Sequence, residues 1–177
     1  MSCRSRPGRR VAFRSGEFDI WLSRSVDGGV TWSAPRRVNP DTGTDHYFSS
    51  IDVGEAGAAS HNGVAYYRTR RIPNENDTLP EGFVPGDPGV TERSSDFVLS
   101  GGFGLTTPYA FTVLSPRFPP PDGIQARFNG DYSGLVVIGT SEAHTMWSDT
   151  RVRIPDPSFD HGTVDEDVFT DRKPLPG

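Results

Sequence analysis

The chain is built from short apolar or aromatic runs separated by clusters of Gly, Pro, Asn and Asp, and this pattern limits the folds open to it. No window of 11 residues carries an apolar stripe at helical spacing, so we expect almost no helix. The 20 Gly and 16 Pro among 177 residues supply the many turns that an all-β chain needs. We expect strands over the runs 18–23, 36–39, 64–67, 97–99, 110–114, 135–138 and 145–147.

Charge and cysteine content exclude several classes of protein. The formal net charge of −5 argues against a nucleic-acid partner, because such a partner needs a basic face to neutralise its phosphates. The single cysteine, Cys3, excludes an internal disulfide and a cysteine-based zinc site. No apolar run approaches the roughly 18 residues of a membrane span. The Arg-rich start, residues 1–16, lacks the apolar run of a signal peptide, and we expect it to be a disordered tail.

Two sequence patterns recur along the chain at similar intervals. Residues 19–23 (DIWLS) resemble residues 96–100 (DFVLS), and residues 167–170 (DVFT) restart the pattern. Residues 64–71 resemble residues 144–151, an alignment that makes Arg71 equivalent to Arg151. The intervals of 71 to 80 residues exceed the roughly 40 to 50 of the commonest propeller blades, but they suit one four-stranded antiparallel blade with long loops.

These repeats define the expected domain organisation. We assign residues 17–172 to consecutive blades and residues 173–177 to a short tail beyond them. Within the blades, residues 73–88 (PNENDTLPEGFVPGDP) form a long Pro-rich loop, which in a compact domain is either a functional loop or an insertion.

One hairpin carries the specific motif Ser-x-Asp-x-Gly-x-Thr-Trp over residues 25–32 (SVDGGVTW). Its Asp can hydrogen-bond nearby backbone N–H groups in a tight turn, and its two Gly can supply positive φ angles. Its Trp adds a large apolar face whose indole N–H needs a partner. We therefore assign a structural role to the defined positions Ser25, Asp27, Gly29 and Trp32.

This motif resembles the Asp box, or bacterial neuraminidase repeat, of the sialidase-like β-propellers. Residues 130–135 (GDYSGL), followed by residues 147–151 (WSDTR), are similar to a blade of the same family. The resemblance implies a partial six-bladed β-propeller built of four-stranded antiparallel blades. At about 75 residues a blade, six blades need on the order of 450 residues, so we expect a fragment of about two and a half blades. Residues 100–104 (SGGFG) stand where the next Asp box is expected, without its Asp and Trp.

The resemblance also implies roles for four residues. Sialidases hold the sugar carboxylate with three Arg, because Arg forks grip a carboxylate bidentately; they attack with a Tyr that a Glu activates, and they protonate the leaving group with an Asp. By this resemblance Arg71 and Arg151 would bind the substrate carboxylate, Tyr132 would be the nucleophile and Asp149 would be the general acid. No Glu base and no third Arg can be assigned.

Each of these residues has a structural alternative, which we favour. Arg71 and Arg151 would pair with acids at blade edges, and Tyr132 would be a packing or rim aromatic. Asp149 would be a turn residue or an arginine partner. The acids of residues 156–171 lack the spacing of a calcium loop and would lie in a solvated loop. No metal site and no cofactor is expected.

Two main function hypotheses follow from the resemblance. The first is a sialidase-like glycoside hydrolase that acts on terminal sialic acid or a related acidic sugar, of which this chain is an inactive fragment that needs the missing propeller blades. The alternative is a non-catalytic Asp-box propeller that binds glycan or protein partners. A remnant without independent function is a third. The family implies an extracellular location, although the sequence shows no export signal.

Overall fold

The computed structural model describes residues 18–56, 59–70, 95–105, 109–118, 132–155 and 163–177. These residues form an all-β structure of antiparallel sheets, as the sequence predicts, and no helix occurs among them. The tail expected at 1–16 and the loop expected at 73–88 lie outside the described residues.

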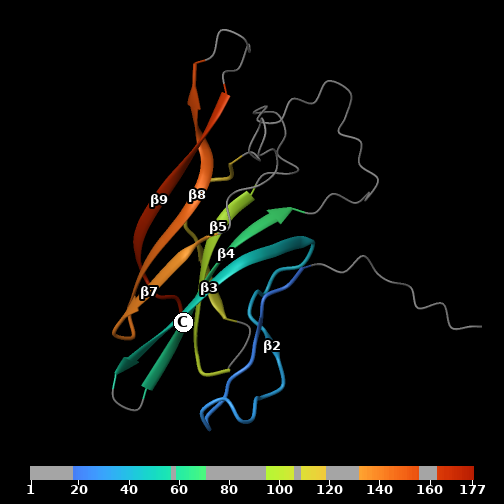
Figure 1. The fold of residues 1–177 in the computed structure, drawn as a ribbon, viewed down its shortest axis with the longest axis vertical. Coiled ribbons are helices and arrows are strands. Elements are labelled where there is room, and N and C mark those ends of the chain that lie inside the picture. Colours follow the sequence, from blue (N-terminus) through green and yellow to red (C-terminus); the bar gives the residue numbers. More distant parts are fainter. Residues whose placement is uncertain (1–17, 57–58, 71–94, 106–108, 119–131, 156–162) are drawn as a thin grey trace, which may run out of the picture.

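The described strands form three sheets that follow one another along the chain (Figure 1). The hairpin layer pairs β1 (Trp21–Leu22) with β2 (Arg36–Arg37). The central sheet has the strand order β3 (Thr44–Ala56), β4 (Ala59–Arg70), β5 (Ser95–Phe103) and β6 (Ala110–Val113). The outer sheet has the order β7 (Gly134–Ile138), β8 (Glu142–Ile154) and β9 (Thr163–Pro174). Among these, only the central sheet has the four strands expected of a blade.

The strand pattern in the sequence predicts every described strand in part except β3. That strand mixes His, Asp and Ser with isolated apolar residues, so no apolar run marks it. A bulge between Tyr47 and Ser50 also interrupts its alternation, and Phe48 adopts a φ of 50° there. A bulge places two residues opposite one, which shifts the side-chain alternation that a sequence pattern relies on.

The C-terminal residues 173–177, expected as a tail beyond the sheets, belong to the packed structure. Lys173 and Pro174 complete β9, and Leu175 is buried in the core. The Leu175 N–H donates a hydrogen bond of 2.9 Å to the Ser141 carbonyl oxygen. One Leu among Lys and Pro gives no periodic signal, so only the tertiary contacts reveal its role.

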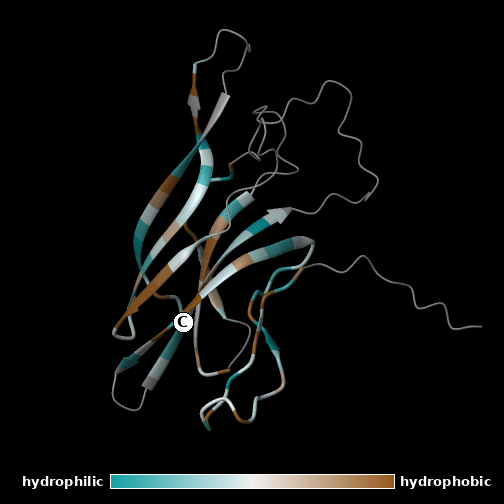
Figure 2. Cartoon of the chain, viewed as in Figure 1, coloured by the Kyte–Doolittle hydropathy of each residue, from teal (hydrophilic) through white to brown (hydrophobic). Residues whose placement is uncertain are grey.

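The inner strands of the central sheet, β4 and β5, are buried on both faces, and alternate residues of each strand point to opposite faces. One face packs against the hairpin layer in a cluster of Val38, Val64, Tyr66, Val98 and Tyr109. The other face packs against the outer sheet in a cluster that includes Ala65, Tyr67, Phe97, Leu99, Val137, Ala143, Trp147 and Leu175. The apolar segments in Figure 2 follow the strands of the central and outer sheets. The described residues thus form a stack of three layers.

Glycines on the central sheet allow the outer sheet to approach closely. A Cβ atom on Gly63 would lie 2.8 Å from Cγ2 of Val137, and one on Gly101 would lie 2.0 Å from the carbonyl oxygen of Pro176. Carbon atoms pack at about 3.5–4.0 Å, so no other residue fits there without a shift of the outer sheet.

A buried histidine joins the central sheet to one end of the outer sheet, where the β7–β8 turn and the C-terminal residues lie side by side. His61 places Nδ1 2.6 Å from the Thr140 carbonyl oxygen and Nε2 2.8 Å from the Pro176 carbonyl oxygen. Its ring stacks on Phe103 with the ring centroids 4.2 Å apart. The contact holds the β7–β8 turn and the C-terminal residues against β4.

The strand pair β4–β5 of the central sheet and the pair β8–β9 of the outer sheet have the same arrangement. The residues that correspond between them differ by one position from the sequence alignment of 64–71 with 144–151. Tyr66 pairs with Val98, and both face the hairpin layer that precedes them in the chain. Trp147 pairs with Phe169, and both face the central sheet that precedes them. Trp147 is therefore equivalent to Tyr66. A bulge interrupts the register of β8 after Asp149, so the equivalence is not carried on to Arg151.

Candidate functional site

The Asp-box residues form a closed hydrogen-bonded turn between β1 and β2. Asp27 accepts hydrogen bonds from the Thr31 N–H at 2.9 Å and from the Thr31 hydroxyl at 2.6 Å. The Ser25 hydroxyl donates to Asp27 at 2.8 Å and accepts from the Gly29 N–H at 2.8 Å. These polar side chains bond to one another and to the loop backbone.

Two glycines and a tryptophan complete this turn. Gly28 and Gly29 have φ angles of 71° and 92°, in the left-handed region that favours glycine. The indole Nε1 of Trp32 donates to the Gly29 carbonyl oxygen at 3.1 Å, while the ring stays largely exposed. These residues stabilise the turn, and both carboxylate oxygens of Asp27 accept hydrogen bonds within it.

β8 brings together Asp149, a candidate general acid, and Arg151, a candidate ligand of the substrate carboxylate. The Asp149 carboxylate is fully buried and accepts hydrogen bonds from the Trp147 indole at 2.9 Å and from the Arg151 backbone N–H at 3.1 Å. The Arg151 Nε donates at 2.8 Å to both carboxylate oxygens, and its Nη2 also donates. Asp149 is therefore the partner of Arg151, the structural alternative considered from the sequence.

Aromatic rings hold the Arg151 guanidinium in place. Its Cζ lies 3.9 Å from the centroid of the Phe169 ring and 5.7 Å from that of Trp147. Guanidinium groups stack favourably on aromatic faces. With Asp149 shut off from solvent and Arg151 bonded to it, the pair has no exposed acid to protonate a leaving group.

Tyr132, a third candidate, does not join this cluster. Tyr132 is 84% exposed, just before β7. The chain beside it is anchored to β3, because the Ser50 hydroxyl donates at 2.6 Å to the Ser133 carbonyl oxygen. Arg71 lies outside the described residues. The described structure therefore unites Asp149 with Arg151 and leaves Tyr132 on the surface.

A charged network that the sequence analysis missed joins the hairpin layer to the central sheet. Arg68 donates to Asp96 at 2.9 and 2.7 Å and to Asp41 at 3.3 Å. His46 is buried, with Nε2 3.0 Å from Asp41 and Nδ1 3.1 Å from the Phe18 carbonyl oxygen. Asp96 opens the repeated Asp-apolar-apolar pattern and pairs with Arg68 across the sheet, but nothing in the sequence links Asp41 to them.

The pKa of Asp41 reflects this network. Burial alone would raise the pKa of its carboxyl, but the charge of His46, the Thr44 hydroxyl and the charge of Arg68 together lower it below its usual value. The network therefore stabilises a charged carboxylate between layers. Its partners lie within the fold, which indicates a structural role.

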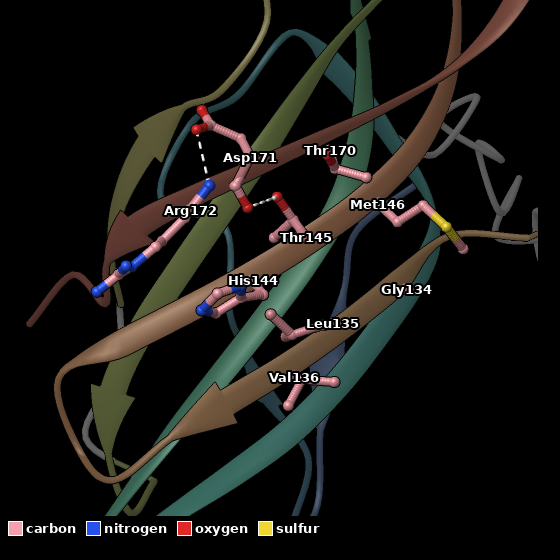
Figure 3. A pocket seen from close by; sticks show the side chains of 9 residues that line it. All are labelled: Gly134, Leu135, Val136, His144, Thr145, Met146, Thr170, Asp171 and Arg172. Atoms are coloured by element: carbon pink, nitrogen blue, oxygen red, sulfur yellow. Dashed lines mark hydrogen bonds between the residues drawn. The ribbon is translucent and has the colours of Figure 1, made fainter.

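An open cavity of about 600 Å³ lies on the outward side of the outer sheet (Figure 3). Its floor contains Gly134, Val136 and Met146, and its rim contains His144 and Arg172. Glu142 bridges the rim, since it accepts from His144 at 2.8 Å and from Arg172 at 2.5 Å. The cavity combines an apolar floor with a polar edge.

Comparisons with known proteins add nothing to this geometry: no family model, no curated protein and no solved structure matches the chain. The class of protein defined by the described residues is an all-β stack of antiparallel sheets. Within these residues, no group of three or more His, Cys, Asp or Glu is placed to hold a metal ion. The described part of the chain also contains no helix suited to crossing a membrane.

We predict that Asp149→Asn lowers the free energy of unfolding by about 2 kcal/mol, because it leaves a partly buried guanidinium without its counter-charge. Urea denaturation followed by tryptophan fluorescence measures the change. Glu142→Gln, at an exposed ion pair, is the matched control and should leave the midpoint nearly unchanged. Wild-type stability in Asp149→Asn would show that the pair is not structural.

The Asp box should respond to acid in a defined range. Hydrogen bonds from the Thr31 hydroxyl, the Thr31 N–H and Ser25 lower the pKa of Asp27 from 3.8 to about 2. A carboxyl whose pKa is depressed in the folded state stabilises it above the unfolded pKa of about 4 and loses that contribution as pH falls through about 2. The amide NMR signals of Gly29 and Thr31 should hold constant down to about pH 4 and shift below it, with a midpoint near 2. Asp27→Asn should remove the step, and a midpoint near 4 would contradict the bonding pattern.

Proposed function

We propose that the chain is part of a sialidase-like Asp-box β-propeller. The Asp-box hairpin supports this proposal. Its Ser25 and Asp27 side chains accept hydrogen bonds from backbone N–H groups of the turn, and the turn connects the paired strands β1 and β2. The layering supports it as well, since three antiparallel sheets stack face to face in chain order. In a propeller of this family, further blades cover the two outward faces of such a stack.

Within that fold the chain serves as a non-catalytic module that binds glycans. The observation that carries this proposal is the closed Asp149–Arg151 pair, in which the candidate acid is fully buried and bonded to the candidate carboxylate-binding residue. General acid catalysis requires the acid to lie within hydrogen-bond reach of the leaving group. A buried, fully engaged carboxylate does not meet that requirement.

Tyr132 is the residue through which a glycan would be bound. Its side chain is exposed just before β7, and its neighbour Ser133 is tied to Ser50, so the backbone that carries it is fixed. A tyrosine offers an apolar ring for the C–H face of a sugar and a hydroxyl for its polar edge. Because the segment that carries this exposed aromatic residue is already anchored, binding a glycan there would lose little conformational entropy.

Hydrolysis is the second candidate, and the exposed Tyr132 is the observation that favours it. In the resembling enzymes a tyrosine in a Tyr-Ser-x-Leu context is the nucleophile, and residues 132–135 read Tyr-Ser-Gly-Leu. A nucleophile must be accessible to substrate, and Tyr132 meets that condition. Such chemistry would need an acid and a base other than Asp149.

A glycan array of neutral and sialylated sugars, probed with the purified chain, tests the binding role. We expect binding to at least one sugar class, reduced about tenfold or more in Tyr132→Ala, a loss of about 1.4 kcal/mol. Val26→Ala, at an equally exposed site on the Asp-box turn, is the control and should bind as wild type. Absence of binding to every glycan would overturn the proposal.

The same protein should release no fluorophore from a fluorogenic sialic acid glycoside. Release by the wild type that disappears in Tyr132→Phe would establish hydrolysis in place of simple binding. Release that persists in Tyr132→Phe would show that Tyr132 is not the nucleophile.

A further inference from the structure

His61, on β4, has an oxygen acceptor in front of each of its two ring nitrogens. Nδ1 lies 2.6 Å from the Thr140 carbonyl oxygen, and Nε2 lies 2.8 Å from the Pro176 carbonyl oxygen. A backbone carbonyl can only accept a hydrogen bond, and a neutral imidazole has a single N–H to donate. Both contacts are therefore hydrogen bonds at the same time only when the ring is an imidazolium, which donates from both nitrogens.

Loss of one proton from His61 would make one of these contacts unfavourable. The nitrogen that loses its hydrogen would present a lone pair to a carbonyl oxygen at 2.6 or 2.8 Å. The side chain is buried, so water has little access to replace the missing donor. A buried acceptor that is left without a donor destabilises the contact in which it lies.

The groups packed around His61 leave its charge to be stabilised by the two carbonyls. β3 places Gly54 opposite it, and β5 places Phe103 opposite it. A Cβ atom on Gly177 would lie 3.0 Å from Nε2. Among the described residues, no carboxylate of a side chain or of the chain end lies within 4.0 Å of the ring nitrogens. Burial opposes the charged form of a histidine and acceptors on both nitrogens favour it, so the two effects oppose each other at this ring.

His46, a second buried histidine, has a different environment. Its Nε2 lies 3.0 Å from an oxygen of Asp41, and its Nδ1 lies 3.9 Å from an oxygen of Asp19. These carboxylates compensate the charge of a protonated ring, and Asp41 is also bonded to Arg68. His61 has no such counter-charge, so its two contacts depend on carbonyl dipoles alone.

We propose that His61 is a pH-sensitive latch whose imidazolium holds residues 175–177 and the β7–β8 turn against β4, and that loss of its proton releases residues 175–177. These residues are the part that leaves, because β9 ends at Pro174 and no strand pairing holds the chain beyond it. The attached state binds a proton that the released state gives up, so a rise in pH favours release. Histidine ordinarily changes its charge between about pH 5 and 8, which is the range over which the latch would act.

Release would uncover the part of the central sheet where glycines allow a close approach. Cδ1 of Leu175 would lie 3.2 Å from a Cβ atom on Gly63 and 3.1 Å from one on Gly101. The contact between these glycines and the C-terminal residues is thus coupled to the protonation of one side chain. The latch depends on the layered fold and not on glycan binding.

Long-range ¹H–¹⁵N NMR of the 177-residue chain tests the protonation of the ring directly. At about pH 5, both ring nitrogens of His61 should carry a proton. A His61 ring with a single proton at that pH, in a chain whose Leu175 amide is still protected from exchange, would overturn the proposal. This measurement uses the wild-type chain and needs no variant to fold.

Hydrogen exchange at the Leu175 amide measures the release, because its bond to Ser141 opens when residues 175–177 leave the turn. Its protection factor, which corrects for the effect of pH on exchange itself, should fall at least about tenfold between about pH 5 and 8. The Leu99 amide, in β5, should stay protected throughout. A Leu175 protection factor that is constant over this range would overturn the proposal.

Two variants assign the pH dependence to one histidine. His61→Gln, whose side chain has an amide that does not titrate, should make the protection of Leu175 independent of pH. His144→Gln, at a histidine whose side chain is 45% exposed, is the matched control and should keep the wild-type dependence. Circular dichroism checks that both variants fold. A dependence that persists unchanged in a folded His61→Gln variant would overturn the proposal.

Discussion

The inner strands of the central sheet, β4 and β5, have both faces buried, and this constraint organises the whole structure. Val64 and Tyr66 face one neighbouring layer while Ala65 and Tyr67 face the other, so these inner-strand residues are shielded from water on both sides. Burial raises the pKa of Tyr66 and of Tyr67 to about 12. A sheet of this kind requires a covering layer on each side, and the hairpin layer and the outer sheet supply them.

Buried polar and charged groups bridge the layers of the described structure. Arg68 bonds to acids of two different segments, and His61 contacts carbonyl oxygens of the β7–β8 turn and of the C-terminal residues. Asp149 and Arg151 bond to each other beneath Trp147. Buried polar groups need such partners, and a partnered group is unavailable to a substrate.

Local features of the fold could be predicted from the sequence, and long-range ones could not. The Asp-box turn and most strands follow from turn residues and short apolar runs, which act within a few positions. The Asp149–Arg151 pair was also foreseeable, since the two residues are two positions apart. Strand β3 and the burial of Leu175 depend on tertiary contacts. The equivalence of Trp147 with Tyr66, one residue from the sequence alignment, follows from the strand pairing. Similarity between short sequences does not specify how strands pair.

Hydrogen exchange measured residue by residue tests the two-faced burial of the central sheet most directly. Amides at 64–67 and 97–99 should be the slowest in the protein and should exchange only through global unfolding, because their strands are hydrogen-bonded on both sides and covered on both faces. The amides of β9, at the edge of the outer sheet, should exchange faster through local opening. Exchange of the β4 and β5 amides at rates equal to those of β9 would contradict this account.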